Sequence, residues 1–243
     1  MIIQSKTLSE FLSKYYKNIK KLRFNVYSAI NKSSDNVILK ISPKIKKHYI
    51  SIFKLNNKNI IKVLKFRKFK SFDIIEMEQF FGKPLSINQV PIRKKKFVKD
   101  IIKTIYYLID NNLVHCDIRP LNILLNEKDL KIIDFDNCTK PNIEFRMAGS
   151  VFIAPEIKGG KVHKYSDLYS VGVILSLILL KDKFPSFNNG YRADCEIIKE
   201  KLKIEINNDT ITKIINKFIN MNSKCRYIPY HQVTKLVDRS KIL

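Results

Sequence analysis

The sequence predicts an α+β fold, with a β-rich region over residues 1–80 and a mainly helical region over residues 81–243. In the first region, residues 24–30 and 36–41 are β-rich runs on either side of a polar turn, a pattern typical of a hairpin. In the second region, the apolar residues of segment 97–108 recur at helical spacing. These patterns favour a sheet that is followed by a set of helices.

The composition predicts an intracellular protein with a well-formed core. Of its 243 residues, 45% are hydrophobic. The longest apolar run, Val171–Leu180, is too short to span a bilayer and is typical of a buried helix. The N-terminus does not resemble a signal peptide. We therefore expect a soluble protein, cytoplasmic or nuclear, with no membrane span.

The cysteines are not spaced like metal ligands. They include no C-x-x-C pair, so we expect all four thiols to be reduced, as is usual inside cells. They are Cys116, Cys138, Cys195 and Cys225.

The chain is strongly basic, with 46 Lys and Arg against 22 Asp and Glu and a net charge of +24. Residues 1–76 alone hold 18 basic and 4 acidic residues. Such a field attracts polyanions, such as nucleic acid, an acidic membrane face or an acidic protein. Lys, Ile and Asn are all abundant, however, so AT-rich coding is by itself a sufficient cause of the charge. Polyanion contact through the basic N-terminal region is therefore one open interpretation.

Other elements follow from local patterns. Thr7 or Ser9 could cap a short helix, and the basic run that begins at Arg93 opens a longer one. In chain order, we predict helices at 7–18, 44–55, 93–108, 196–204, 209–221 and from 233 onward, with a further strand from residue 74 that leads toward Gly82.

The central stretch, residues 113–136, carries the residues suited to phosphoryl chemistry. Asp117 and Asp134 lie at the edges of short apolar runs, and Asn122 follows Asp117 by five residues. An Asp can accept a proton from a hydroxyl, while Asn and Asp oxygens are ligands that Mg²⁺ prefers. Arg119 can neutralise charge on a phosphoryl group.

These residues resemble the motifs of the eukaryotic-type protein kinases. The family pattern H-R-D-L-x-x-x-N appears as His115 to Asn122, and D-F-G appears as Asp134 to Asp136. The A-P-E motif appears as Ala154 to Glu156, and Asp167 to Gly172 resembles D-x-W-S-x-G. The resemblance covers about residues 20–235 and implies a bilobal fold that uses ATP with Mg²⁺ or Mn²⁺.

The resemblance also implies roles for individual residues. Asp117 would be the catalytic base and Arg119 would contact the transferred phosphate. Asn122 and Asp134 would hold the metal ion. The run Val37 to Lys40 resembles V-A-I-K, which makes Lys40 the phosphate-binding lysine.

The rest of the nucleotide site is predicted in the N-terminal lobe. Val26 would line it, and backbone groups near Glu78 and Phe80 would bind adenine, with Met77 as the gatekeeper residue. In the helical lobe, the resemblance implies a structural ion pair, Glu156 with Arg226. It also implies that Asp167 anchors the backbone of the catalytic loop, with His115 packed in the core.

Several family features are missing. No glycine precedes Gly82, so segment 19–25 lacks the G-x-G-x-x-G loop that lets backbone N–H groups approach phosphate. Lys20, Lys21 or Arg23 could supply charge instead.

Three further positions depart from the family. His48 stands where the helix glutamate that pairs with the strand lysine is expected, and no Asp or Glu lies between Asp35 and Asp73. Cys116 replaces the arginine that pairs with a phosphorylated activation loop, and Asp136 replaces the glycine of D-F-G.

Three functions remain open on these observations. The leading one is a protein serine/threonine kinase, because Arg119 to Asn122 is closer to the serine/threonine version of the loop. The alternative is a pseudokinase, a binding module or decoy for a kinase or its substrate. The third is a polyanion binder. The expected partners are a protein substrate or a partner kinase.

Overall fold

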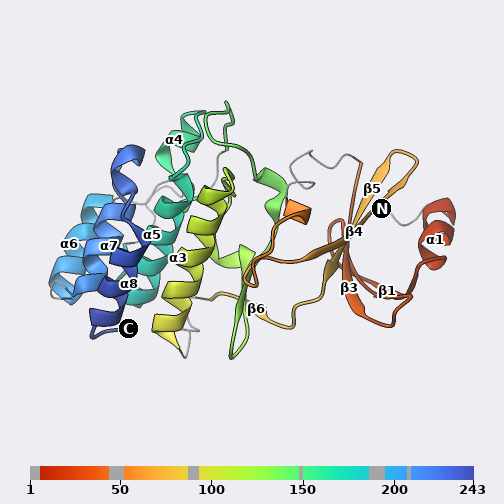
Figure 1. The fold of residues 1–243 in the computed structure, drawn as a ribbon, viewed down its shortest axis with the longest axis horizontal. Helices are drawn as coiled ribbons and strands as arrows, with labels where there is room; N and C mark the ends of the chain where they lie inside the picture. Colours follow the sequence, from red (N-terminus) through yellow and green to blue (C-terminus); the bar gives the residue numbers. More distant parts are fainter. Residues whose placement is uncertain (1–5, 44–51, 87–92, 148–149, 186–194, 207–208) are drawn as a thin grey trace. The chain divides into compact units, whose positions relative to one another are not determined.

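The computed structural model describes residues 6–43, 52–86, 93–147, 150–185, 195–206 and 209–243. The chain divides into two compact units, Met1–Phe81 and Gly82–Leu243 (Figure 1). The first is built on a sheet and the second on helices, so the predicted α+β, two-lobed fold is confirmed.

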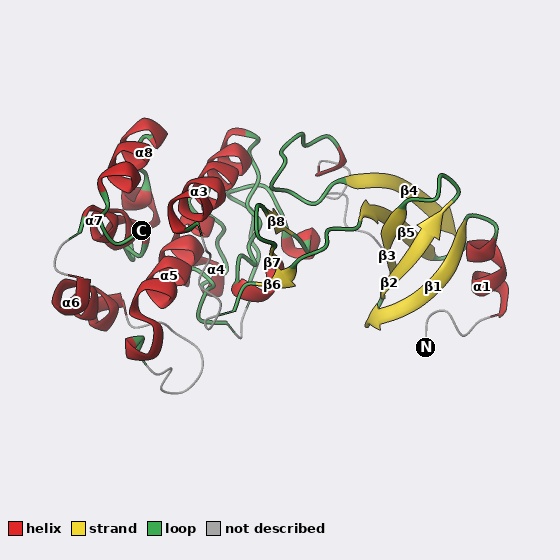
Figure 2. Ribbon diagram, turned by 90° about the horizontal axis from the view of Figure 1, so that it is seen from below, coloured by secondary structure: helices red, strands yellow, loops and turns green. Residues whose placement is uncertain are grey.

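In the part of the first unit that the structure describes, a short helix packs against an antiparallel sheet (Figure 2). Its strands run in the order β1-β2-β3-β5-β4. The elements are α1 (Lys6–Ser13), β1 (Tyr16–Arg23), β2 (Val26–Asn31), β3 (Asn36–Ser42), β4 (Val63–Phe69) and β5 (Phe72–Glu78). Of the predicted helix 44–55, residues 44–51 lie outside the described residues and residues 52–53 are helical.

The predicted first helix is wrong at its C-terminal end. The helix stops at Ser13, and the chain enters β1 at Tyr16 rather than continuing to Asn18. Tyr16 is buried, and its hydroxyl donates a 2.8 Å hydrogen bond to the Glu76 carboxylate on β5. This long-range contact, with the pairing of β1 to β2, outweighs the local preference of the segment for helix.

The two faces of this sheet differ. One face packs against α1 through an apolar cluster, so its strand residues are shielded from water. The cluster comprises Leu8, Leu12, Tyr16, Tyr27, Ala29, Val37, Leu39, Ile41 and Ile74. The opposite face carries Val26, Lys40, Ile75 and Met77, as the strand register shows. The candidate phosphate lysine therefore lies on the face away from α1.

The second unit surrounds a buried central helix, α5 (Ser166–Leu180). All but one of its residues are buried, as the apolar run predicts. The predicted core of α3, from Phe97 to Leu108, is also buried. The other helices are α3 (Lys94–Asp110), α4 (Pro155–Lys158), α6 (Cys195–Ile206), α7 (Thr210–Phe218) and α8 (Tyr230–Arg239).

A small sheet completes this unit and supports the motif-bearing loops. It contains β6 (Lys83–Pro84), β7 (Ile123–Leu125) and β8 (Leu130–Ile132) in that order. Within the described ranges, 3-10 turns lie at Pro120–Asn122, Phe135–Asn137, Lys181–Lys183 and Ser223–Arg226.

All four cysteines are free thiols. Among the described residues, no helix is both long and apolar enough to cross a membrane.

Candidate functional site

The loop from His115 to Asn122 folds so that Asn122 and Asp117 contact each other. The 3-10 turn Pro120–Asn122 brings the Asn122 amide back over the loop. Its Nδ2 donates to the Asp117 carbonyl at 2.9 Å and to Asp117 Oδ2 at 3.0 Å. The sequence interval of five residues thus becomes a direct contact, and it fixes the orientation of one Asp117 carboxylate oxygen.

The other oxygen, Asp117 Oδ1, is buried and accepts no hydrogen bond from any residue that the structure describes. Arg119 Nε lies 3.4 Å from it, within ion-pair distance but without hydrogen-bond geometry. A buried acceptor of this kind is costly unless another donor binds it. A substrate hydroxyl is such a donor.

Burial raises the pKa of Asp117 to about 6. The Arg119 charge and the Asn122 hydrogen bond oppose that rise, whereas the charges of Asp134 and Asp136 add to it. The carboxylates of Asp134 and Asp136 are therefore close enough to Asp117 to influence its pKa. A base with a pKa near 6 is ionised at neutral pH and can still accept a proton effectively.

A buried carboxylate on α5 holds the backbone of this loop. Asp167 Oδ2 accepts from the His115 N–H at 2.6 Å, and Oδ1 accepts from the Cys116 N–H at 3.0 Å. Cys116 has a φ of 66°, a left-handed conformation that costs energy for a residue with a side chain. The predicted anchoring role of Asp167 is confirmed, because its two bonds hold this strained turn. Burial raises the pKa of Asp167 to about 7.

His115 is fully buried, as predicted, and is not placed for acid–base work. Its Nδ1 accepts the Asp117 N–H at 3.2 Å, and its Nε2 lies 3.1 Å from the Ile133 carbonyl. Because Nδ1 is an acceptor, Nε2 must carry the proton, and the ring is neutral. Burial lowers the pKa of His115 to about 4, in agreement with this neutral state.

Asp134 also has a left-handed backbone, with φ and ψ both 65°. The 3-10 turn that follows, Phe135–Asn137, includes Asp136 in place of the glycine of the family motif. Non-glycine residues with such angles tend to occur at functional sites, where the surroundings compensate for the strain.

The donor set fits a hard divalent cation. Asp134 offers a carboxylate, and Asn122 offers an amide oxygen because its nitrogen already binds Asp117. Among the described residues there is no group of three His, Cys, Asp or Glu side chains that could hold a metal. A magnesium ion bound with substrate phosphates needs only one or two protein carboxylates, so Asn122 and Asp134 are candidates for its protein ligands.

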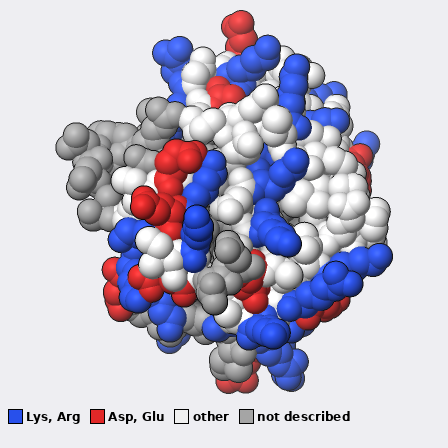
Figure 3. Space-filling view, turned by 90° about the vertical axis from the view of Figure 1, so that its left-hand side faces the viewer, with Lys and Arg blue, Asp and Glu red and all other residues white. Residues whose placement is uncertain are grey.

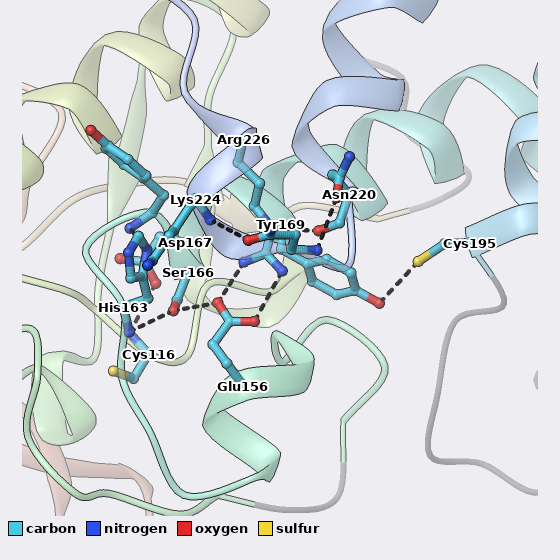
Figure 4. Close-up of polar contacts among 12 residues, drawn as sticks. Cys116, Glu156, His163, Ser166, Asp167, Tyr169, Cys195, Asn220, Lys224 and Arg226 are labelled. Carbon is cyan, nitrogen blue, oxygen red and sulfur yellow. Dashed lines mark hydrogen bonds and ion pairs between the residues drawn. The ribbon is translucent and has the colours of Figure 1, made fainter.

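A second, largely buried network joins Glu156, Ser166 and Arg226 and is shown in Figure 4. Arg226 Nη1 and Nη2 donate to the two Glu156 oxygens at 2.5 Å and 2.9 Å, which confirms the predicted pair. Arg226 Nε donates to the Asn220 carbonyl, and the guanidinium lies over the Tyr169 ring. The sequence reasoning assigned no role to Ser166, whose hydroxyl donates to Glu156 at 2.6 Å. Its position one residue before Asp167 placed it beside a motif but did not indicate Glu156 as its partner.

The predicted nucleotide residues lie in the first unit. Val26 and Lys40 are directly paired across β2 and β3, and Met77 lies on the same face. Glu78 ends β5, where its N–H donates to the Lys62 carbonyl and its Oε1 accepts the Lys62 N–H. Phe80 follows β5 and is partly exposed.

The glycine-rich loop is absent in the structure as well as in the sequence. β1 joins β2 through a two-residue turn, Phe24 and Asn25, in which Asn25 has a φ of 61°. The Phe24 side chain is 75% exposed at the tip of the hairpin. His48, the residue at the expected glutamate position, lies outside the described residues.

Comparison with known proteins identifies the family. The model of the protein kinase domain matches residues 18–235. A protein of Acanthamoeba polyphaga mimivirus named "Putative serine/threonine-protein kinase" is 30% identical over 86% of this chain and 81% of its own length.

Two eukaryotic relatives match smaller segments. "Calcium-dependent protein kinase 4" of Plasmodium falciparum is 30% identical over 58% of this chain and 29% of its own length. "Mitogen-activated protein kinase kinase kinase 17" of Arabidopsis thaliana is 38% identical over 33% of this chain and 23% of its own length. This chain therefore spans most of the viral protein but less than a third of either eukaryotic one. The matched domain, the two-lobed fold and the motif residues all agree, and the chain belongs to the protein kinase family.

Proposed function

We propose that this chain is a serine/threonine kinase that transfers the γ-phosphate of ATP to a hydroxyl group of a protein. The observation that carries this proposal is the state of Asp117, whose Oδ2 binds Asn122 and whose buried Oδ1 accepts no hydrogen bond within the described chain. That is the arrangement expected of a base waiting for a substrate proton. The sequence Arg119 to Asn122 and the name of the viral relative support the choice of serine or threonine.

Asp117 and Arg119 would act on the two ends of the reaction. The hydroxyl oxygen of the substrate attacks the γ-phosphorus while its proton passes to Asp117 Oδ1. The bond from the γ-phosphorus to the bridging oxygen breaks, and ADP leaves. The Arg119 guanidinium, beside Asp117, stabilises the negative charge on the transferred group.

Asn122 and Asp134 would hold Mg²⁺ or Mn²⁺. Such an ion would supply positive charge beside the phosphates. Two hydrogen bonds to Asp117 orient the Asn122 side chain, and Asp134 immediately precedes the 3-10 turn Phe135–Asn137.

The first unit would bind the nucleotide. Lys40 would contact the phosphates, Val26 would line the site, and the backbone around Glu78 and Phe80 would bind adenine. Lys40 and Val26 are neighbours on one face of the sheet, which supports a shared role.

The alternative function is a pseudokinase that binds a kinase or its substrate without catalysis. The tight turn at Phe24 and Asn25 favours it, because side chains replace the glycine backbone that approaches phosphate in the family. Measurable phosphate transfer would exclude this alternative.

A polyanion partner is a further proposal for the basic chain. Residues 1–81 include 18 Lys and Arg but only 5 Asp and Glu, and this excess of positive charge would favour binding of nucleic acid or an acidic protein. On the second unit, Figure 3 shows Asp and Glu interspersed among the Lys and Arg, so that view offers no single-sign patch. Binding that falls with salt and ignores ATP would identify such a partner.

A transfer assay tests the main proposal. The purified chain is incubated with γ-labelled ATP, Mg²⁺ or Mn²⁺ and a mixture of Ser-, Thr- and Tyr-containing proteins, beside an Asp117→Asn variant. We expect label on Ser or Thr with the parent and at least a hundredfold less with the variant. Equal labelling by both proteins, or none by either, would contradict the proposal.

A further inference from the structure

The hairpin that replaces the glycine-rich loop carries a row of cations whose direction is set by strand register. Arg23 pairs with Val26, and Val26 pairs with Lys40 on the next strand. Directly paired residues of antiparallel strands point to the same face of the sheet. Arg23 and Lys40 therefore share a face, with one strand between them and a backbone separation of roughly 10 Å.

Two irregularities in β1 add two more cations to this face. Lys17 pairs with Ile30 and Lys20 pairs with Ser28, both on the face of Val26. Regular alternation would send residues 17 and 20 to opposite faces. Register shifts between Lys17 and Lys20, and again between Lys21 and Arg23, bring all three cations to one face.

Lys21 is the exception, and it provides an internal comparison. It pairs with Tyr27, which belongs to the apolar cluster under α1, so it points to the opposite face. Lys20, Lys21 and Arg23 are all exposed and adjacent in sequence. Lys20 and Lys21 project to opposite faces of the sheet.

We propose that Arg23 and Lys20 bind the phosphates of the nucleotide on the Lys40 face, in place of the backbone N–H groups of a glycine-rich loop. This inference rests on the proposed nucleotide-binding function. A guanidinium can bind phosphate oxygens through two parallel hydrogen bonds, and Lys20 adds a point charge. Side-chain donors make close approach of the backbone unnecessary, which accounts for a phosphate site beside Phe24 and without glycine.

Nucleotide affinities of four proteins test the proposal. The parent, Arg23→Gln, Lys20→Gln and the control Lys21→Gln are titrated with Mg²⁺-ATP and with adenosine, which has no phosphate. We expect ATP affinity to fall about tenfold for Arg23→Gln and severalfold for Lys20→Gln, because each loses charge-assisted hydrogen bonds. Adenosine affinity should not change in any variant. Lys21→Gln should bind ATP like the parent, although its charge loss is identical.

The outcomes separate the inference from the function on which it rests. If the parent binds ATP, and Arg23→Gln and Lys21→Gln lower the ATP affinity equally, the inference is wrong while nucleotide binding stands. If the parent binds no ATP, the proposed function fails and the inference fails with it. Melting temperatures confirm that each variant is folded, and Arg23→Lys, which keeps the charge, should recover part of the lost ATP affinity.

Discussion

Arg226 donates to both oxygens of Glu156, across 70 residues of sequence, and its side chain is fully buried. The pair joins the segment before α8 to the start of α4. Since Ser166 and the Asn220 carbonyl complete the hydrogen bonding, neither charge is left without a partner.

Glu156→Ala should lower the free energy of unfolding by roughly 3–5 kcal/mol, because the fully buried Arg226 charge loses its partner. Arg226→Ala should also lower it, because the Glu156 carboxylate, whose side chain is 16% exposed, loses both Arg226 donors. Chemical denaturation measures this loss. The matched control is the Lys199–Glu196 surface pair, where Glu196→Ala should cost less than about 1 kcal/mol. ATP affinity of the folded variants should match the parent. Lost affinity with unchanged stability would reverse the structural assignment of the pair.

Catalytic activity should increase as the pH rises through about 6. The pKa of Asp117 is raised to about 6 by burial, and only the ionised carboxylate can accept the hydroxyl proton. Below that pH the rate should fall about tenfold per pH unit. Single-turnover rates between pH 5 and 8 check this, with melting curves at each pH to exclude unfolding. A flat profile would remove Asp117 from the role of base.

Phosphorylation of the activation segment should not be required for activity. Cys116 replaces the arginine of the family motif and is buried, so it cannot pair with a phosphate. The hydroxyl side chains between Asp134 and Glu156 are Thr139, which is buried, and Ser150. The rate of transfer should survive phosphatase treatment and the Ser150→Ala substitution. A large loss of transfer rate in either case would show that a cation other than the replaced arginine binds the phosphate group.

Gly172→Ala should destabilise the second unit by about 1–3 kcal/mol. A Cβ at Gly172 would lie 2.7 Å from Ile219 Cγ2 and 2.9 Å from Phe218 Cβ, so α5 and the end of α7 would have to separate. Gly159→Ala is a milder control, because its nearest contact would be 3.3 Å. Equal melting temperatures for the two variants would show that the helices adjust without cost.

Site residues that lie close together in sequence were predictable, because a single turn is enough to bring them into contact. Asp117 and Asn122, which the sequence pattern selected together, meet through one 3-10 turn. The Glu156–Arg226 pair has no local signal; only the resemblance to a known family suggested it. Ser166 was overlooked because a lone hydroxyl beside a motif gives no indication of its partner.

Other features depended on packing that periodicity does not reveal. The end of α1 was misplaced because Tyr16 is committed to Glu76, 60 residues away. The sheet face to which Lys20 and Lys21 each point could not be predicted either. Register shifts in β1 interrupt the regular alternation of side chains along a strand, and a prediction from sequence assumes that alternation. Sequence left the two lysines equivalent, and the pairing of β1 with β2 distinguishes them.

The packing of α1 against the sheet has a practical consequence for work with isolated fragments. The family match begins at residue 18, beyond the whole of α1 and beyond Tyr16. A fragment cut at that boundary would expose Val37, Leu39 and other strand residues that are 0% exposed in the full chain. A contiguous apolar patch on a sheet surface promotes aggregation. If such a fragment fails to express, the cause would therefore be the loss of α1 and not a defect in the rest of the kinase domain.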